Sequence, residues 1–323
     1  MQDSHYTMRI AWIDIIRGIC MLLILWFHTE VYFVGTEIIP YHLYVADALC
    51  CFYFLSGYLF FTNNTFDLRH KLKSIIKNIV TPYFFFTLLL AVPKSLANDI
   101  PVSNILINII CGNASWFVTS LIVAELLFAF LLYVNKQWLI HIVVPLSLIA
   151  SWLLTGTNIA VNYNFWNFHN ALIGLFFLYL GYEYHRHETF FQRFNSHYIS
   201  FILLIVLIAI KTYIYNNDVS LLIEPVCISN YFVFLIDTIV FILFLITINY
   251  QLSNFNSIQW VGRHSLVYYF FCGAIPMAVS KTLFAVNINY TAYWQIPLVF
   301  IIVVIISSII VWLCYRCLPF LKR

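Results

Sequence analysis

Charged side chains are scarce in this sequence, and their scarcity decides the class of protein. Only 9% of the 323 residues are charged, whereas 63% are hydrophobic and the mean hydropathy is +0.90. Soluble domains carry about 25% charged residues. A water-soluble globular protein is therefore excluded, and no basic surface for nucleic acid is available. We expect an integral membrane protein that works among membrane lipids.

Patterns typical of metal, redox and nucleotide sites are also missing. The eight cysteines form no paired CxxC motif and the histidines form no cluster suited to zinc, so no metal site is predicted. There is no phosphate-cradling glycine loop and no internal repeat. Most cysteines fall in apolar runs, where Cys packs as a small hydrophobe. Cys111 and Cys227 lie in predicted outer segments, and a disulfide between them is left as one alternative.

Ten long apolar runs account for nearly the whole chain. Each approaches the roughly 17 to 25 residues that a membrane helix needs, and the polar gaps leave no room for a soluble domain. We therefore expect an all-α, polytopic protein with one membrane domain over residues 1–323 and no appended soluble domain. The expected spans are 11–33, 43–61, 79–96, 116–134, 138–155, 168–184, 199–215, 230–250, 266–284 and 293–318.

The distribution of Lys and Arg predicts the orientation. Cytoplasmic loops of membrane proteins are enriched in these residues. With the N-terminus inside, the outer loops hold no Lys or Arg and instead carry Glu37, Asp99, Asp218 and Glu224. Both termini are therefore expected in the cytoplasm. The inner loops and tails hold Arg9, Arg69, Lys71, Lys73, Lys77, Lys136, Arg186, Arg193, Arg263, Arg316, Lys322 and Arg323.

The first apolar run contains two ionisable residues, in the stretch RGICMLLILWFH. Arg17 and His28 are eleven residues apart, which places them on one helix face and about 16.5 Å apart along the axis. An arginine inside a membrane helix costs at least about 2.5 kcal/mol, so it should face a partner or a wet cavity. Asp14 lies within reach of Arg17 on that face. One interpretation is a structural Asp14 and Arg17 pair, with His28 hydrogen-bonded near the surface; the other is a functional site.

Four stretches carry a resemblance to a known family. RIAWIDIIRGICMLLILWFH resembles the first helix of the acyltransferase 3 family of membrane acyltransferases, in which an arginine, ten residues and a histidine recur. FYFLSGYLFF, KSIIKNIVTPYFFF and GRHSLVYYFFC are similar to later motifs of that family, in the same order. The chain departs from the family pattern at Asn78, where many members have Arg, and at Cys272, where many have His.

The resemblance implies transfer of an acyl group from cytoplasmic acyl-CoA to a hydroxyl of a cell-surface glycan or lipid-linked sugar. The acyl group is expected to be acetyl, with succinyl left open, and no cofactor is expected to stay bound. His28 would be the general base. Arg17, Arg69, Lys73 and Lys77 would bind the donor phosphates, although basic inner loops also serve topology alone. The expected location is a bacterial cytoplasmic membrane.

Further candidates are weaker. Glu125, in WFVTSLIVAELL, could orient His28 or contact the acceptor, or simply make a hydrogen bond between helices, and Trp116 opens the same segment. Trp166 and His169, in NYNFWNFH, could contact sugar rings or anchor the chain at the interface. Glu30 is interpreted as a surface acid. Ser56 and Gly57 are interpreted as a close helix contact.

Charged residues inside other spans leave two rival functions open. Asp47, Asp237, Lys211 and Lys281 could form ion pairs or line an acceptor pocket. A transporter or flippase for a glycan intermediate would also use such charges, although no paired halves are visible. A sensor with a decayed active site is a further alternative, given Asn78 and Cys272.

Overall fold

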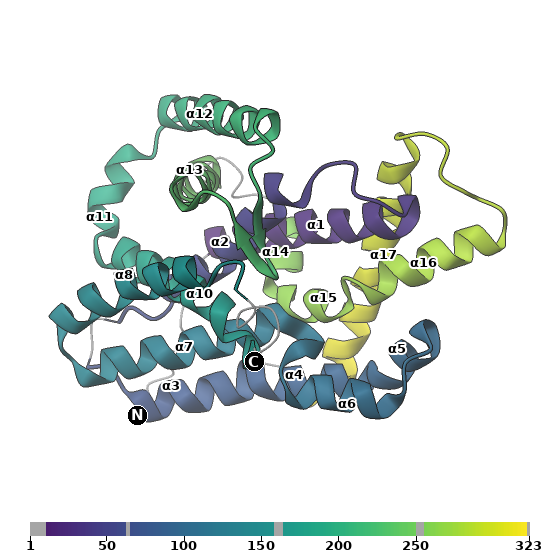
Figure 1. Cartoon of the computed structure of the whole chain (residues 1–323), viewed down its shortest axis with the longest axis horizontal. Coiled ribbons are helices and arrows are strands. Elements are labelled where there is room, and N and C mark those ends of the chain that lie inside the picture. Colours follow the sequence, from purple (N-terminus) through teal and green to yellow (C-terminus); the bar gives the residue numbers. More distant parts are fainter. Residues whose placement is uncertain (1–10, 63–64, 158–163, 250–254, 322–323) are drawn as a thin grey trace.

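The structure is a computed structural model and describes residues 11–62, 65–157, 164–249 and 255–321. Nearly all of this part is helical, and one short hairpin is its only β-structure. Figure 1 shows α1, coloured purple, crossing the middle of the molecule, with α12 and α13 on one side and α16 and α17 on the other. The predicted all-α class is confirmed. Arg9, Lys322, Arg323 and the first residues of the 162–169 stretch lie outside the described residues.

Every predicted apolar run is helical over most of its length. The helices are α1 (Ala11–Val34), α2 (Val45–Tyr58), α3 (Leu68–Ile75), the π-helical turn η2 (Ile76–Val80), α4 (Thr81–Leu89), α5 (Ala91–Asn98), α6 (Val102–Ile110), α7 (Trp116–Val134), α8 (Gln137–Leu154), α10 (Phe168–Arg186), α11 (Glu188–Phe191), α12 (His197–Asn216), α13 (Tyr231–Asn249), α14 (Asn256–Arg263), α15 (Ser265–Phe271), α16 (Ala274–Ala285) and α17 (Gln295–Cys317). Short 3₁₀ turns are η1 (Tyr41–Leu43), η3 (Asn113–Ser115), η4 (Phe165–Asn167), η5 (Gln192–Phe194) and η6 (Pro319–Leu321).

Six of the described helices are long and apolar enough to cross a membrane, or eight if two bent pairs each count as one span. The prediction of ten spans is therefore not confirmed. The 14 residues of α2 rise only about 21 Å, less than the roughly 30 Å of a hydrocarbon core. The bent pairs are the long helix from Leu68 to Leu89 with α5, at 41°, and α15 with α16, at 45°.

Proline accounts for the two irregularities next to the sequence motifs. Pro82 has no N–H to donate to the preceding turn, and the chain widens there into η2, where the Thr81 N–H bonds the Ile76 carbonyl. Pro276 likewise cannot donate to the Cys272 carbonyl, and the bend between α15 and α16 falls at Cys272 and Gly273. Both breaks follow directly from the sequence.

Glycines set the closest helix contacts. A Cβ placed on Gly57 would lie 1.8 Å from the Leu178 carbonyl oxygen, so α2 and α10 pack backbone to backbone. The predicted close contact at Gly57 is confirmed. A Cβ on Gly262 would lie 1.7 Å from the Asp14 carbonyl oxygen. The glycine of the GRHSL motif therefore lets α14 dock against α1.

The loop between α12 and α13 folds into a buried β-hairpin. Strands β1 (Leu221–Ile223) and β2 (Val226–Ile228) pair antiparallel, with Ile223 opposite Val226, and Glu224 and Pro225 form the turn. Both ends of β1 and both ends of β2 are buried. β1 contacts η1 and α2, so the hairpin packs among helices. We call this end of the molecule the hairpin end and the opposite end, where α3 begins, the basic end.

Candidate active site

His28 lies on α1 near the hairpin end, in an aromatic environment. Its ring stacks on Tyr32 at a centroid distance of 6.2 Å and meets the edge of Phe27 at 5.5 Å. The side chain is half-buried, and no described residue forms a hydrogen bond with it. Both imidazole nitrogens therefore remain available to a substrate, as a general base requires.

The bend between α15 and α16 reaches the same place. A Cβ on Gly273 would lie 3.7 Å from the Tyr32 hydroxyl oxygen. Because Tyr32 stacks on His28, the end of the GRHSLVYYFFC motif and the end of the first-helix motif meet in space. Cys272, where the resembled family often has His, is buried and free. The two motifs form one site although about 240 residues separate them in sequence.

Arg17 lies nearer the basic end of α1 and is half-buried. Asp14, one turn earlier, forms its ion pair with Arg263 of α14, with the Arg263 Nε 3.1 Å from the Asp14 Oδ2. The predicted local pair with Arg17 is therefore not the contact that Asp14 makes here. Asp14 instead fastens α14 to α1 beside Gly262, which leaves Arg17 outside that ion pair.

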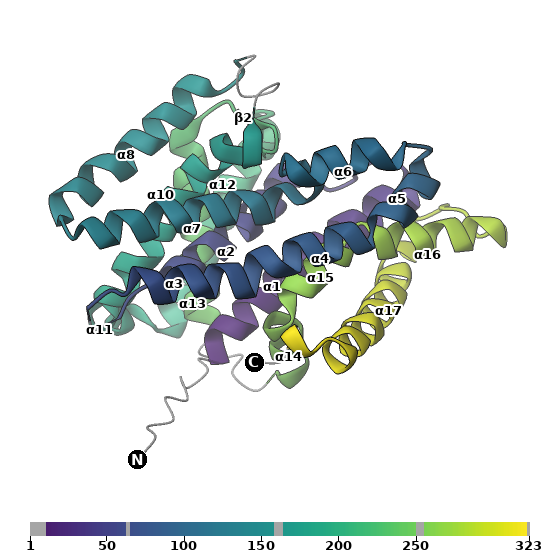
Figure 2. The same ribbon diagram turned by 90° about the horizontal axis from the view of Figure 1, so that it is seen from below.

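Three predicted donor-binding cations lie on one rod at the basic end. Arg69, Lys73 and Lys77 follow each other at intervals of four residues along α3 and η2, and all three are exposed. Residues four apart share a helix face, and we call these three the basic stripe. Figure 2 shows the rod of α3 and α4 running alongside α7. Asn78, the departure from the family pattern, donates to Ser74 at 2.9 Å.

Lys71 faces the opposite way, into the protein. Its Nζ lies 3.1 Å from Oε2 of Glu125, whose other oxygen accepts from the Ser56 hydroxyl at 2.5 Å. The ammonium also lies 3.5 Å from the centre of the Phe60 ring. Glu125 is 4% exposed. This buried group joins α2, α3 and α7.

Of the alternatives for Glu125, the hydrogen bond between helices is the one seen, and no contact with His28 occurs among the described residues. Glu125 makes its contacts with Lys71 and Ser56, and a second polar pair, Tyr53 with Ser120, lies about one turn along α2 and α7. Glu125 therefore belongs to the contact between the basic rod and the bundle.

The predicted acceptor residues lie at the hairpin end, and two of them make structural bonds. The Trp166 indole N–H donates to the Ile110 carbonyl at 3.0 Å. His169 is buried and its Nε2 lies 2.9 Å from the Ser151 carbonyl oxygen. Trp116 is half-buried at the first residue of α7. Only Trp116 keeps its side chain without a described polar partner.

Glu30 is fully buried, so its interpretation as a surface acid is wrong. The chain after α1 folds back over it, and the Ile39 N–H donates to both carboxylate oxygens at 3.3 and 3.4 Å. Cys111 and Cys227 are both free thiols, and the alternative of a disulfide between them is not realised.

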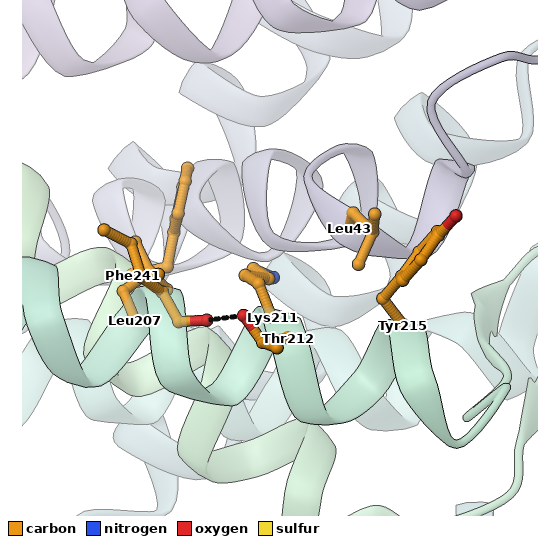
Figure 3. A pocket seen from close by; sticks show the side chains of 7 residues that line it. Leu43, Leu207, Lys211, Thr212, Tyr215 and Phe241 are labelled. Atoms are coloured by element: carbon orange, nitrogen blue, oxygen red, sulfur yellow. Dashed lines mark hydrogen bonds between the residues drawn. The ribbon is translucent and has the colours of Figure 1, made fainter.

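A shallow groove of about 410 Å³, whose lining does not include His28, lies between η1, α12 and α13. Figure 3 shows its lining, with Leu43, Leu207, Lys211, Thr212, Tyr215 and Phe241 labelled. Lys211 is paired with both Asp47 and Asp237, and Thr238 donates to Asp47. Of the two alternatives left open, ion pairing is the one seen for Asp47, Asp237 and Lys211, whereas the Lys281 ammonium donates to the Ala97 carbonyl at 3.2 Å. Because two carboxylates neutralise its one cation, the groove offers no free positive charge to a phosphate.

Sequence reasoning missed the residues whose partners are remote. Arg263 was assigned only to topology, yet it pairs with Asp14 across 249 positions. Asn170, a buried amide of α10, holds the hairpin turn and was not singled out. The available signal is the run Asn164, Asn167 and Asn170, in which Asn recurs every third residue.

Comparison with known proteins agrees with this geometry. Residues 10–316 match the family model Acyl_transf_3, described as an acyltransferase domain. No curated protein and no solved structure matches the chain. The match includes three of the four motif stretches in full and the first one except for Arg9, and the structure brings the first and the last of them together at Tyr32. The chain therefore belongs to the acyltransferase 3 family, whose members are membrane acyltransferases.

Proposed function

We propose that the protein is an O-acyltransferase of a bacterial cytoplasmic membrane, with the basic end in the cytoplasm. It takes an acyl group, acetyl in the first instance, from acyl-CoA and transfers it to a hydroxyl of a cell-surface glycan or lipid-linked sugar. One observation carries the proposal. The domain that matches the family model has His28 at one end, with no hydrogen bond to any described residue, and exposed cations at the other end.

The basic end supplies the charge that a CoA donor needs. CoA carries several phosphate charges, and Lys and Arg bind phosphate as point charge and bidentate fork. The basic stripe exposes three such cations on one face. Arg17 lies on α1, about 16.5 Å from His28 along the helix axis. The stripe holds the phosphates, and Arg17 binds or orients the donor along its path.

His28 provides the proton transfer. A sugar hydroxyl is a poor nucleophile at neutral pH, and a positioned histidine raises the rate of such attack by about 10² to 10⁴-fold. The hydroxyl oxygen forms a bond to the thioester carbonyl carbon while His28 takes the hydroxyl proton. The carbon–sulfur bond then breaks, and the CoA thiolate leaves with the proton from His28. The ester and free CoA are the products.

Glu125 has a positioning role in this proposal. By pairing with Lys71 it fixes α3 against α7, and the basic stripe, on another face of the same rod, stays exposed. Trp116 remains an acceptor contact, whereas Trp166 and His169 support the backbone around it.

Release of CoA tests the function. Purified protein is mixed with acetyl-CoA and an envelope-glycan extract, and free CoA is measured for wild type, His28→Ala and His197→Ala. His197 is an exposed histidine at the start of α12 and serves as the matched control. We expect glycan-dependent release by wild type and His197→Ala, and a loss of at least 100-fold in His28→Ala.

Two outcomes would contradict the proposal. Full release by His28→Ala would remove His28 from the chemistry. No release and no CoA binding by wild type, with acetyl-CoA or succinyl-CoA, would favour the transporter alternative, because a flippase has no use for the donor.

A further inference from the structure

Glu224 occupies the turn of the buried hairpin, and a single amide holds it there. The Asn170 Nδ2 donates to Oε2 of Glu224 at 2.7 Å and also to the Ile223 carbonyl. Asn170 is fully buried, and its own Oδ1 accepts from Asn164 at 2.6 Å. Amide contacts on both sides of Asn170 therefore fix one oxygen of the Glu224 carboxylate in a defined position.

The other oxygen of this carboxylate has no described partner. No described residue donates to Oε1, and no described Lys, Arg or His lies within ion-pair distance of Glu224. Three other acids of the interior form ion pairs: Asp14 with Arg263, Asp47 with Lys211, and Glu125 with Lys71. Glu30 has no described ion-pair partner either, but both of its oxygens accept from the Ile39 N–H. Glu224 is half-buried, and burial raises its pKa above the ordinary value of 4.5, although the bond from Asn170 works against the rise.

Tyr41, in the turn η1 beside the hairpin, presents a second unused polar group. Its hydroxyl oxygen is buried and has no partner among the described residues. Burial raises the pKa of Tyr41 well above its ordinary value, and the neighbouring charges, Glu224 among them, add to the rise. β1 contacts η1, so the hairpin and Tyr41 lie together.

Aromatic contacts connect this pair to the candidate base. The Tyr41 ring meets the edge of Phe27 at 5.4 Å, and Phe27 meets the edge of His28 at 5.5 Å. Glu224, Tyr41 and His28 thus lie one after another in space, around one end of α1. The Tyr41 hydroxyl is buried without a described partner, which is costly unless something binds it. Oε1 of the half-buried Glu224 is free of described donors and can accept from a bound hydroxyl.

We propose that Glu224 and Tyr41 bind the hydroxyl groups of the acceptor and thereby present one of them to His28. This inference rests on the proposed function, because it names the acceptor-binding part of the same site. A polyhydroxylated acceptor such as a sugar has adjacent hydroxyls that each donate and accept. One donates to Glu224 Oε1, and another accepts from the Tyr41 hydroxyl. Hydrogen bonds to a charged group are the stronger ones, so Glu224 contributes more than Tyr41.

Kinetics of Glu224→Gln, with Asp218→Asn as the matched control, test the inference. Gln keeps the shape and an oxygen for the Asn170 bond, but removes the charge. Asp218 is an exposed acid of the same loop. The apparent KM is measured for the envelope-glycan extract, dosed by total sugar, and for acetyl-CoA. We expect Glu224→Gln to raise the glycan KM at least tenfold, Tyr41→Phe to raise it a few-fold, and neither to change the acetyl-CoA KM.

Each alternative outcome has a definite meaning. A glycan KM in Glu224→Gln equal to that in Asp218→Asn, with an active wild type, overturns the inference and leaves the proposed function intact. A rise in both KM values together with a lower unfolding temperature also overturns it, because Glu224 would then only hold the hairpin. An inactive wild type overturns the proposed function, and this inference with it.

Discussion

The ion pair of Lys71 with Glu125 gives an asymmetric prediction. At 3.1 Å and an effective dielectric constant near 20, the gross attraction is about 5 kcal/mol. Desolvation of Glu125 offsets much of it. In Lys71→Met the attraction is lost while the carboxylate stays buried, and breaking such pairs costs about 3 to 5 kcal/mol. Since the Lys71 side chain is 20% exposed, we expect the lower end, about 3 kcal/mol.

Glu125→Gln should lower the free energy of unfolding much less than Lys71→Met does. The Lys71 ammonium keeps its partial exposure and the face of the Phe60 ring at 3.5 Å, and the Gln amide oxygen still accepts from Ser56. The remaining loss is about 1 kcal/mol, typical of one hydrogen bond. The double change Lys71→Met with Glu125→Leu removes both charges and should recover stability beyond Lys71→Met alone.

Thermal unfolding in detergent measures this order, with the acetyl-CoA KM measured on the same samples. We expect wild type to have the highest unfolding temperature, Glu125→Gln a lower one and Lys71→Met the lowest. Lys71→Met should also raise the KM for acetyl-CoA, because α3 is released from α7. Lys73→Met serves as the control for the unfolding temperature only, because it removes an exposed cation of the same helix; as a change in the basic stripe it is itself expected to raise the acetyl-CoA KM. If Glu125→Gln is destabilised as much as Lys71→Met, the reasoning from a buried, stranded carboxylate is refuted.

Three further predictions rest on other contacts. Gly57→Ala places a methyl 1.8 Å from a backbone oxygen that cannot swing aside, so it should lower the free energy of unfolding by about 1 to 3 kcal/mol, measured by thermal unfolding. Gly273→Ala, whose Cβ would meet only the Tyr32 hydroxyl at 3.7 Å, should not show this clash. Replacing the basic stripe with Gln should raise the acetyl-CoA KM with each charge removed, and the wild-type KM should rise with salt. Because the pKa of Glu224 is raised, its charged form is less favourable in the folded protein than in the unfolded chain. The stability of wild type therefore falls as the pH rises through the unfolded and then the folded pKa of Glu224. We expect the unfolding temperature of Glu224→Gln to exceed that of wild type at pH 7, and the difference to vanish near pH 4.

The positions of the helices could be predicted because apolar run length determines them locally. α7 begins and ends where the sequence indicated, at Trp116 and Val134, since polar residues flank it on both sides. The number of spans could not be fixed in the same way. The run expected over 43–61 yields only the 14 residues of α2, because η1 takes up its start and the helix ends at Tyr58.

The pairing of charged residues could not be predicted from local spacing. Helix geometry favours Arg17 as the neighbour of Asp14, yet Arg263 takes that place because Gly262 lets α14 approach α1 closely. Glu30 illustrates the same limit, since its burial depends on a loop that folds back from Ile39. The local sequence pattern predicts which residues share a helix face. The docking of a distant helix decides which charged residues become partners.

The arrangement along α1 argues for a reaction at the hairpin end. Charged groups at the basic end are paired or exposed, as Asp14 with Arg263 and the basic stripe show, and these suit binding of an anionic donor. At the hairpin end the polar groups of His28, Tyr41 and Glu224 have unused hydrogen-bonding capacity among the described residues. Proton transfer to an incoming hydroxyl needs such unused groups, and phosphate binding does not. Under the proposed function the acyl group therefore travels from the cations to His28, and the acceptor need never enter the basic end.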